Sequence, residues 1–240
     1  MPNLVGERVT LRALEPGDAA IAQTWINDPE FCRYLRDISF PYSLQAEQEW
    51  IGSQVAAEAD GTSYTFGIQT EDHKLIGTIG LQRISYKDGH AGMGVGIGPA
   101  SHRGRGYGSE AVNTLLRFAF GDLRLHKIWL EVDAGNTKAV RCYGSIGFKH
   151  EGVMRDHTYR DGRHRDYYMM SILDREFKGW PGGKARPARK AKPGNRVVAG
   201  LRAGTAARTR APGGKAASNG RKSSGNKPSS ARSARKRSAP

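Results

Sequence analysis

The first half of the chain alternates apolar and polar residues in a way that predicts one strand, three helices and three further strands. Residues 8–14 (RVTLRAL) alternate as a half-buried strand does, and Pro16-Gly17-Asp18 ends that strand. Asp18 and Ser43 are placed to cap helices. The helical stretches are Asp18–Asn27, Pro29–Leu35 and Leu44–Ala59. An antiparallel meander of strands follows at Ser63–Gln69, Leu75–Ser85 and Ala91–Ile97.

The second half adds a glycine-rich loop, two helices and three strands. Gly108–Gly121 repeats apolar residues with helical period, at Ala111, Leu115, Leu116, Phe118 and Ala119. We predict a buried strand at Lys127–Val132, a helix at Thr137–Ile146 ended by Gly147, and a closing hairpin of Phe148–Met154 with Arg165–Leu173 across Asp161-Gly162. This order predicts an α+β fold with a mixed central sheet and one strand–loop–helix–strand crossover.

Charge divides the chain into two parts. Residues 181–240 hold 17 of the 38 Lys and Arg residues and no Asp or Glu, so residues 1–180 are close to neutral although the whole chain carries +15. The 181–240 segment is almost entirely Gly, Ala, Ser, Pro, Lys and Arg, and we expect it to be a disordered basic tail that binds polyanions without sequence specificity. We therefore predict a folded domain at 1–180 and a tail at 181–240.

Several classes of protein are disfavoured by the composition. No apolar run approaches the ~20 residues of a membrane-spanning helix, and the N-terminal residues lack the apolar core of a signal peptide. Cys32 and Cys142 give no disulfide framework, and the histidines show no zinc-site spacing. We expect a cytoplasmic protein without a metal. Cys142 is expected to be a buried helix residue.

The glycine-rich loop at residues 97–110 (IGPASHRGRGYGSE) carries the clearest chemical signal. It leaves a strand and opens a helix, so its backbone N–H groups and the helix N-terminus can converge on one anion. Two arginines add positive charge, and a pyrophosphate is the natural guest. The residues predicted to bind it are Arg103, Gly104, Arg105, Gly106, Tyr107, Gly108 and Ser109.

Other interpretations of this loop fit less well. A dinucleotide-binding fingerprint would use Glu131 or Asp133 on the ribose, but Ser109 replaces its third glycine, and the loop follows an antiparallel meander. A Walker loop needs Gly-Lys-Ser/Thr, which is missing. A flexible linker does not account for the strand before the loop and the periodic helix after it.

The loop resembles the R/Q-x-x-G-x-G/A element of the GNAT superfamily of acyltransferases, with Arg103, Gly106 and Gly108 at the fixed positions. Residues 130–152 (LEVDAGNTKAVRCYGSIGFKHEG) are similar to the superfamily's next strand, helix and strand. The N-terminal GERVTLRALEPGDA and the spacing of residues 155–173 resemble the subfamily of ribosomal-protein N-terminal alanine acetyltransferases and spermidine N-acetyltransferases. The resemblance spans about residues 6–176.

The resemblance implies direct transfer of acetyl from acetyl-CoA, as co-substrate, to a primary amine. The strand Ala91–Ile97 would diverge from Lys127–Asp133 and offer its backbone to the pantetheine arm and to the oxyanion. Tyr143 would be the general acid for the leaving thiolate. The implied cofactor contacts outside the loop are Val95, Gly96, Ile97, Asn136, Ala139 and Tyr143. A helix cap for Asn136 and a core aromatic for Tyr143 are the structural alternatives.

The general base is less well defined. Gly92 stands where much of the subfamily has Glu, and the alternating glycines at 92, 94, 96 and 98 leave one strand face bare. That face gives room for substrate or cofactor, or else it marks a weakened strand. Glu131 is our candidate base, with Asp133, His102 or a water relay as alternatives. Acids that could select a cationic acceptor are Asp28, Glu30 and Asp37.

The function predicted from these features is N-acetylation, with a protein N-terminal α-amine as the favoured acceptor because that amine loses its proton more readily than a lysine or polyamine does. The alternatives are a polyamine or aminoglycoside N-acetyltransferase, and a nucleic-acid-associated protein with a catalytically silent acetyl-CoA-binding domain. The basic tail would add non-specific binding to nucleic acid or the ribosome.

Overall fold

The computed structural model describes residues 3–35 and 40–179 of the 240-residue chain. The basic tail and Asp37 lie outside the described residues. The elements follow in the order β1 (Leu4–Val5), β2 (Val9–Ala13), η1 (Pro16–Asp18), α1 (Ala19–Ile26), α2 (Pro29–Cys32), α3 (Leu44–Ala59), β3 (Tyr64–Thr70), β4 (Leu75–Ser85), β5 (His90–Ile97), η2 (Ala100–His102), α4 (Tyr107–Gly121), β6 (Lys127–Asp133), α5 (Thr137–Ile146), β7 (Lys149–Arg160) and β8 (Arg163–Leu173).

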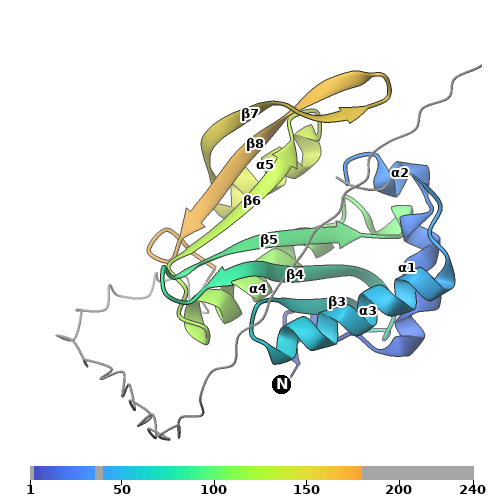
Figure 1. Cartoon of the computed structure of the whole chain (residues 1–240). Coiled ribbons are helices and arrows are strands. Elements are labelled where there is room, and N and C mark those ends of the chain that lie inside the picture. Colours follow the sequence, from blue (N-terminus) through green and yellow to red (C-terminus); the bar gives the residue numbers. More distant parts are fainter. Residues whose placement is uncertain (1–2, 36–39, 180–240) are drawn as a thin grey trace, which may run out of the picture. The chain divides into compact units, whose positions relative to one another are not determined.

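In the described part of the chain these strands form one mixed sheet with the order β1-β2-β3-β4-β5-β6-β8-β7. Neighbouring strands are antiparallel except β5 and β6, which are parallel and joined through the crossover helix α4. Figure 1 shows β5 and β6 side by side at one end and separated at the other. The α+β class, the mixed sheet and the single crossover predicted from the sequence are confirmed.

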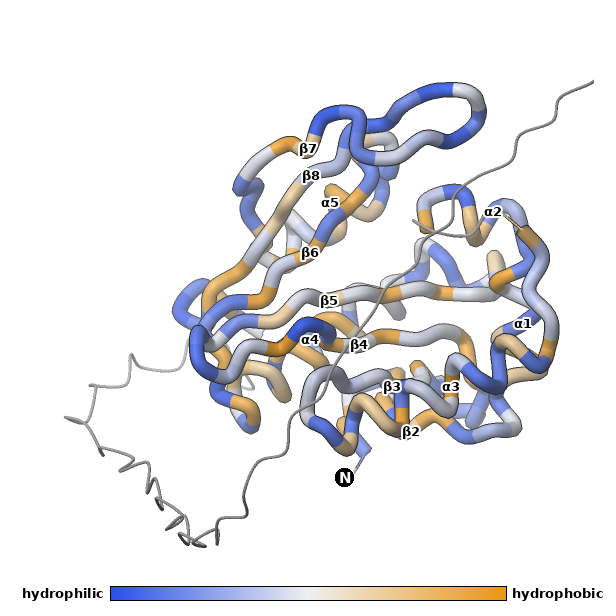
Figure 2. The backbone as a smooth tube through the Cα atoms, in the orientation of Figure 1, coloured by the Kyte–Doolittle hydropathy of each residue, from blue (hydrophilic) through white to orange (hydrophobic). Residues whose placement is uncertain are grey.

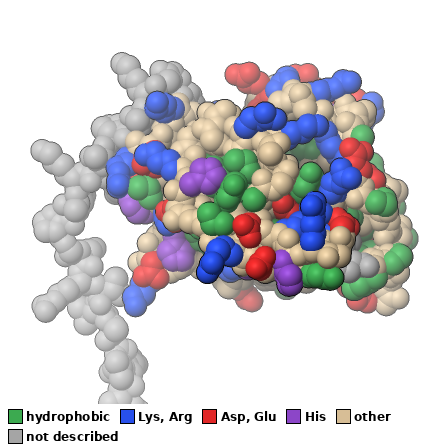
Figure 3. All heavy atoms as spheres, turned by 90° about the horizontal axis from the view of Figure 1, so that it is seen from above, with side chains coloured by type: hydrophobic (Ala, Val, Ile, Leu, Met, Phe, Trp, Pro, Cys, Tyr) green, Lys and Arg blue, Asp and Glu red, His purple; other side chains and the backbone are tan. Residues whose placement is uncertain are grey.

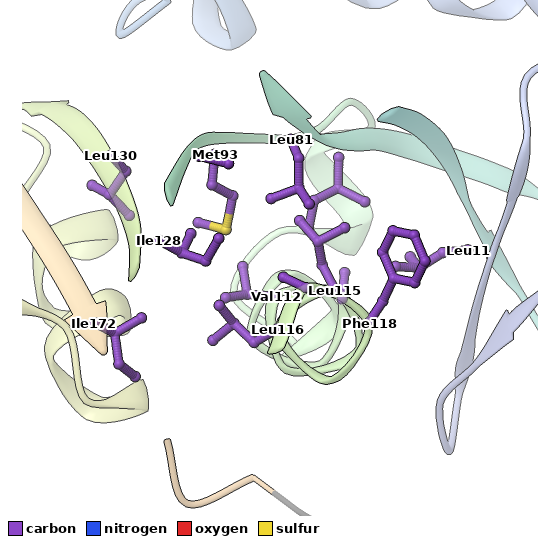
Figure 4. Close-up of a cluster of buried hydrophobic side chains, with 14 of the residues drawn as sticks. Leu11, Leu81, Met93, Val112, Leu115, Leu116, Phe118, Ile128, Leu130 and Ile172 are labelled. Carbon is purple, nitrogen blue, oxygen red and sulfur yellow. The ribbon is translucent and has the colours of Figure 1, made fainter. Parts of the chain in front are cut away.

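The main core lies between the sheet and α4. Val112, Leu115 and Leu116 of α4 are completely buried and belong to one apolar cluster with side chains from β2 to β6 and from β8. Figure 4 shows these residues facing Met93, Ile128 and other strand residues. The apolar residues that repeat with helical period therefore form the face that anchors α4 against the sheet. This contact fixes the position of the helix, whose N-terminus follows the end of β5.

The opposite face of the sheet carries α1 and α3. Leu14, Ala19 and Ile51 form a small buried cluster there, and Trp25 of α1 forms another with Ala22 and Leu75. Within the described ranges, no helix is long and apolar enough to cross a membrane.

Two local predictions differ from the structure, and one short element was missed. The Asp18 side chain makes no capping hydrogen bond to α1. Its carboxylate instead accepts hydrogen bonds from both terminal guanidinium nitrogens of Arg12, each at 2.8 Å. The helix predicted at Pro29–Leu35 ends at Cys32, and the short strand β1 was not predicted. By contrast, Ser43 caps α3 through Ala46 N–H, and Gly147 ends α5 with φ 116°, as predicted.

The closing hairpin is longer than the sequence predicted. β7 extends to Arg160, and the turn at Asp161-Gly162 has both residues at positive φ, 52° and 76°. β7 is the outer strand of the sheet, and its pairing with β8 shifts register twice. Figure 2 shows mainly hydrophilic residues around the hairpin tip, where an exposed edge needs them.

Glu110, in the first turn of α4, ties that helix to the start of β2. Its Oε1 accepts the N–H groups of Arg8 at 2.6 Å and Val9 at 3.1 Å, and its Oε2 accepts Arg8 Nε at 2.9 Å. Burial acts to raise the pKa of Glu110, but these hydrogen bonds outweigh it and the pKa lies below its ordinary value. The helix that carries the glycine-rich loop is thus held at its N-terminal end as well as along its apolar face.

We expect Glu110→Gln to lower the free energy of unfolding at pH 7 by about 1–3 kcal/mol, because charge-assisted hydrogen bonds to two backbone N–H groups are weakened. The folded-state pKa is depressed, so this stabilisation is present above about pH 4.5 and is lost as the pH falls through the folded-state pKa. Urea denaturation across this pH range measures both effects. Glu7→Gln, at an exposed neighbour, is the control. Equal losses in the two variants would contradict this assignment.

Candidate active site

The site lies where the pairing between β5 and β6 stops, well before either strand ends. These strands pair at His90↔Lys127, Ala91↔Ile128 and Gly92↔Trp129 and not beyond. β4 stays paired with β5 as far as Ile97, and β8 stays paired with β6 as far as Asp133. Each strand is therefore kept extended by its other neighbour, and the backbone edges that face each other after Gly92 are left for a ligand. This confirms the predicted divergence.

A cleft of about 1110 Å³ passes through this gap. Most of the predicted site residues line it, from β5, the glycine-rich loop, β6 and α5: Val95, Gly96, Ile97, Arg103, Gly104, Gly106, Gly108, Ser109, Glu131, Asn136, Ala139 and Tyr143. The structure thus brings these side chains to one place. Their individual roles stay predictions.

Two predicted cofactor residues, Arg105 and Tyr107, do not line the cleft. Arg105 is exposed, and its carbonyl oxygen accepts Arg8 Nη1 at 3.1 Å. Tyr107 lines a separate small hollow together with Arg8 and His102. Both residues shape the outer side of the loop.

The glycine-rich loop delivers the N-terminus of α4 to the cleft. Gly104 and Gly106 have φ of 73° and 88°, a region that favours glycine, and Gly106 is the N-cap of α4. The first N–H groups of a helix have no partner within it and carry partial positive charge. A pyrophosphate fits this end of the cleft by that chemistry.

Arg103 has a structural task that the sequence did not indicate. Its Nε donates to Ile97 O at 3.0 Å, and its Nη2 donates to Gly98 O and to Asp28 Oδ2 at 3.2 Å. Its Nη1 lies 3.5 Å from Glu30 Oε2. Arg103 therefore joins the end of β5 to the start of α2, and it pairs with two of the three carboxylates considered for acceptor selection, Asp28 and Glu30.

A second arginine holds the other end of the same segment. Arg160, at the end of β7, donates from Nη1 to Cys32 O at 2.6 Å and from Nη2 to Leu35 O. Residues 30–35 include Phe31, Tyr34 and Leu35, which line the cleft. Two arginines from distant parts of the chain thus fix this segment as one wall of the site.

The alternating glycines of β5 are explained by aromatic neighbours. A Cβ at Gly92 would lie 3.0 Å from the Trp129 ring, and one at Gly96 would lie 3.0 Å from Phe31. A Cβ at Gly98 would overlap Trp25. At Gly94 nothing lies within 4 Å, so this position opens into the cleft. The bare face accommodates aromatic walls and leaves one free space between them.

The helix α5 contributes the residues predicted for the thioester side. Asn136 caps α5, with its Oδ1 accepting Ala139 N–H at 3.2 Å, so the structural alternative for Asn136 is correct, and the residue also lines the cleft. Burial raises the pKa of Tyr143, with a smaller contribution from nearby Cys142. The phenol consequently keeps its proton across the physiological range.

Cys142, predicted to be a buried helix residue, lies in α5 but is only half-buried and lines the cleft. Its Sγ lies 3.1 Å from Ser109 Oγ. This contact joins α5 to the first turn of α4.

The candidate bases differ in their surroundings. Glu131 and Trp129 share one face of β6 by strand alternation, on the side of the bare face of β5. Asp133 is buried and accepts Gly135 N–H at 2.7 Å, with Arg165 Nη1 at 3.5 Å. His102 is on the loop, 3.1 Å from Ser101 Oγ. Glu131 lies in β6 beside the gap, and it lines the cleft.

Sequence reasoning did not identify several residues that shape the cleft. Trp129 and Phe31 are ring neighbours of glycines, and Arg83 of β4 stacks on Trp129 with Cζ 5.2 Å from the ring centroid. Arg160 donates hydrogen bonds to the carbonyl groups of Cys32 and Leu35, which precede it by 128 and 125 residues in the sequence. The alternating glycines were the only local sign that large side chains approach β5.

Comparisons with known proteins agree with this geometry. Residues 8–149 match the family model described as an acetyltransferase (GNAT) domain. An uncharacterised N-acetyltransferase, p20, of Bacillus licheniformis is 33% identical over 180 residues, which are 75% of this chain and 100% of that protein. The putative ribosomal N-acetyltransferase YdaF of Bacillus subtilis is 31% identical over 73% of this chain and 96% of that protein.

The spermidine N(1)-acetyltransferase of Vibrio cholerae is 31% identical over 72% of this chain and 97% of that protein. A crystal structure of spermidine N-acetyltransferase from Vibrio cholerae with CoA and spermine superposes with a TM-score of 0.64, at 30% identity over 70% of this chain and 97% of that one. The fold and cleft are those of an acyl-CoA-dependent transferase. The chain belongs to the GNAT acetyltransferase family, and it is an N-acetyltransferase with acetyl-CoA as co-substrate.

We expect Gly94→Val to reduce kcat/KM at least tenfold while the free energy of unfolding stays equal or rises by about 0.5–1 kcal/mol. The added side chain enters the open space above β5, and valine suits a strand better than glycine does. Turnover is followed by release of the CoA thiol, and stability by thermal unfolding.

Gly152→Val is the matched control, because Gly152 also lies in a strand with nothing within 4 Å of its Cβ position but is outside the cleft. We expect this control to keep wild-type turnover. Full activity in Gly94→Val would place the reacting groups elsewhere.

Proposed function

We propose that this enzyme acetylates the α-amine at the N-terminus of a peptide or protein, with direct attack of the amine in a ternary complex. Bound acetyl-CoA supplies the thioester whose acetyl group is transferred. The free backbone edge of β5 orients the cofactor, and the N-terminus of α4 binds its pyrophosphate. Glu131 accepts the proton of the amine, and Tyr143 donates a proton to the departing thiolate.

The charge balance of the cleft supports a singly charged acceptor. Three acidic residues line it, Glu30, Glu131 and Asp133, and two of them lie 3.5 Å from an arginine nitrogen. The basic residues that line it are Arg33, Arg83, Arg103 and Lys138. The four arginine and lysine residues outnumber the three carboxylates, which disfavours a polyamine with several positive charges more than a peptide N-terminus with one.

The second candidate acceptor is a polyamine. It is favoured by the similarity to the spermidine N-acetyltransferase of Vibrio cholerae, whose crystal structure holds spermine. Seen from above in Figure 3, basic and acidic side chains are interspersed over the described surface on this side, without an extended acidic patch for a polycation. The predicted contribution of the basic tail to ribosome or nucleic-acid binding stays a prediction.

Tyr143→Phe should lower kcat about 100-fold and leave the affinity for acetyl-CoA nearly unchanged, because only proton donation to the thiolate is removed. Since burial raises the pKa of Tyr143, the wild-type rate should show no decline from this group as the pH rises to about 10. Steady-state kinetics and calorimetric titration with acetyl-CoA test the two statements. Equal kcat in the variant would exclude Tyr143 as the acid.

An amine panel tests the acceptor. We expect peptides beginning with Ala, Ser or Met to be turned over with a kcat/KM at least tenfold higher than spermidine or an aminoglycoside. Thiol release from acetyl-CoA reports every acceptor equally, and mass spectrometry locates the acetyl group on the α-amine. Higher kcat/KM with spermidine would reject the peptide acceptor and support the polyamine alternative.

A further inference from the structure

Arg83 is placed at the cleft by an irregularity in the sheet. The pairing of β4 with β5 is regular up to Gln82↔Gly92 and resumes at Ser85↔His90, with a bulge between. Arg83 lies in that bulge with φ 52°, in the left-handed region that side-chain-bearing residues rarely adopt. A bulge of this kind re-aims a side chain, and such strained positions are common at ligand sites.

The Arg83 side chain turns toward the acceptor side of the cleft. Its guanidinium lies over the Trp129 ring, with Cζ 5.2 Å from the centroid, and Arg83, Trp129 and Gly94 line the same cleft. The Trp129 ring in turn covers Gly92. Stacking on an indole holds a guanidinium flat and leaves its N–H edge for a ligand.

No carboxylate of residues 3–35 or 40–179 forms an ion pair with Arg83. The contrast with Arg103 is direct, since the Arg103 guanidinium is used by Asp28, Glu30 and two carbonyl groups. Arg83 is therefore a preoriented cation at the cleft, and none of the described carboxylates pairs with its hydrogen-bonding edge. A planar guanidinium of this kind matches a carboxylate.

Strand geometry places the backbone of Arg83 relative to Gly94. Gly94 pairs with Gly80, and Arg83 follows Gly80 by three residues. At ~3.4 Å per residue the backbone of Arg83 lies at most about 10 Å along the strand from the position opposite Gly94. Its guanidinium lies over the Trp129 ring, which covers Gly92, so it is within reach of the first three residues of an extended peptide. A carboxylate on the second or third side chain would reach Arg83 while the α-amine lies above Gly94.

We propose that Arg83 is a specificity-determining residue that binds an acidic side chain at the second or third position of the acceptor peptide. This inference rests on the proposed peptide acceptor and narrows it to acidic N-termini. Arg83 also repels a cationic chain at the same point, which disfavours polyamines.

The test is calorimetric titration of the CoA-saturated full-length chain with three C-terminally amidated peptides, Ser-Asp-Glu-Ala, Ser-Asn-Gln-Ala and Ser-Lys-Lys-Ala. We expect the acidic peptide to bind about tenfold more tightly than its amide isostere, a difference of about 1.4 kcal/mol. Arg83→Gln should remove that difference, and Arg83→Glu should make the lysine peptide the tightest ligand.

Lys87→Gln is the matched control, because Lys87 is an exposed cation in the turn after β4 and does not line the cleft. The Lys87→Gln variant should keep the tenfold preference for the acidic peptide. This result would distinguish a specific contact with Arg83 from general electrostatic attraction by the positive charges of the protein. The affinity for CoA itself and the midpoint of thermal unfolding should be unchanged in all variants.

Equal affinity for the acidic and amide peptides, no measurable binding of the acidic peptide, or a preference that persists in Arg83→Gln would each overturn the inference. The proposed function is judged separately, by turnover. If serine peptides are acetylated without preference for acidic side chains, the peptide acceptor stands and the role of Arg83 fails. If only polyamines are turned over, the peptide acceptor fails, and the binding data still decide whether Arg83 recognises a carboxylate.

Discussion

The whole site depends on a limit to backbone pairing between β5 and β6. The two strands share only three residue pairs, and their far ends are then held by separate anchors. Arg103 fastens the end of β5 through the carbonyl groups of Ile97 and Gly98, while full pairing with β8 keeps β6 in line. Because both strands stay extended without each other, the gap is a stable feature of the fold, with backbone donors and acceptors along both of its sides.

Side-chain size on the two strands then decides what fills that gap. Because Gly92 and Gly96 carry no side chain, the rings of Trp129 and Phe31 pack directly against β5 and occupy the space that side chains would otherwise fill. Gly94 keeps the one opening between them. The cofactor side, by contrast, is built from α4 and α5, which are joined by Ser109 and Cys142. In the proposed reaction the two substrates approach from opposite faces of the sheet and meet where the pairing of β5 with β6 stops.

The parts of this design that could be predicted from the sequence are local in the chain. The glycine-rich loop, the helix after it, and the α5 segment between Asn136 and Gly147 all carry their signals within a few residues. The contacts that complete the cleft are not local, since Arg103 reaches Asp28 across 75 residues and Arg160 reaches Cys32 across 128. Asp18 shows the same limit, because its expected capping role was lost to Arg12, a partner that no capping rule includes.

Arg103 illustrates how a motif residue can serve a purpose other than the one its charge suggests. Its guanidinium is shared among two carbonyl groups and two carboxylates, so it has little capacity left for a phosphate. The anion binding proposed for this loop therefore depends mainly on the N–H groups at the start of α4. The same contacts tie the cofactor loop to the segment before Leu35, whose other end is held by Arg160. The wall formed by residues 30–35 is therefore attached to the glycine-rich loop, and a displacement of that loop would be transmitted to the wall through Asp28 and Glu30.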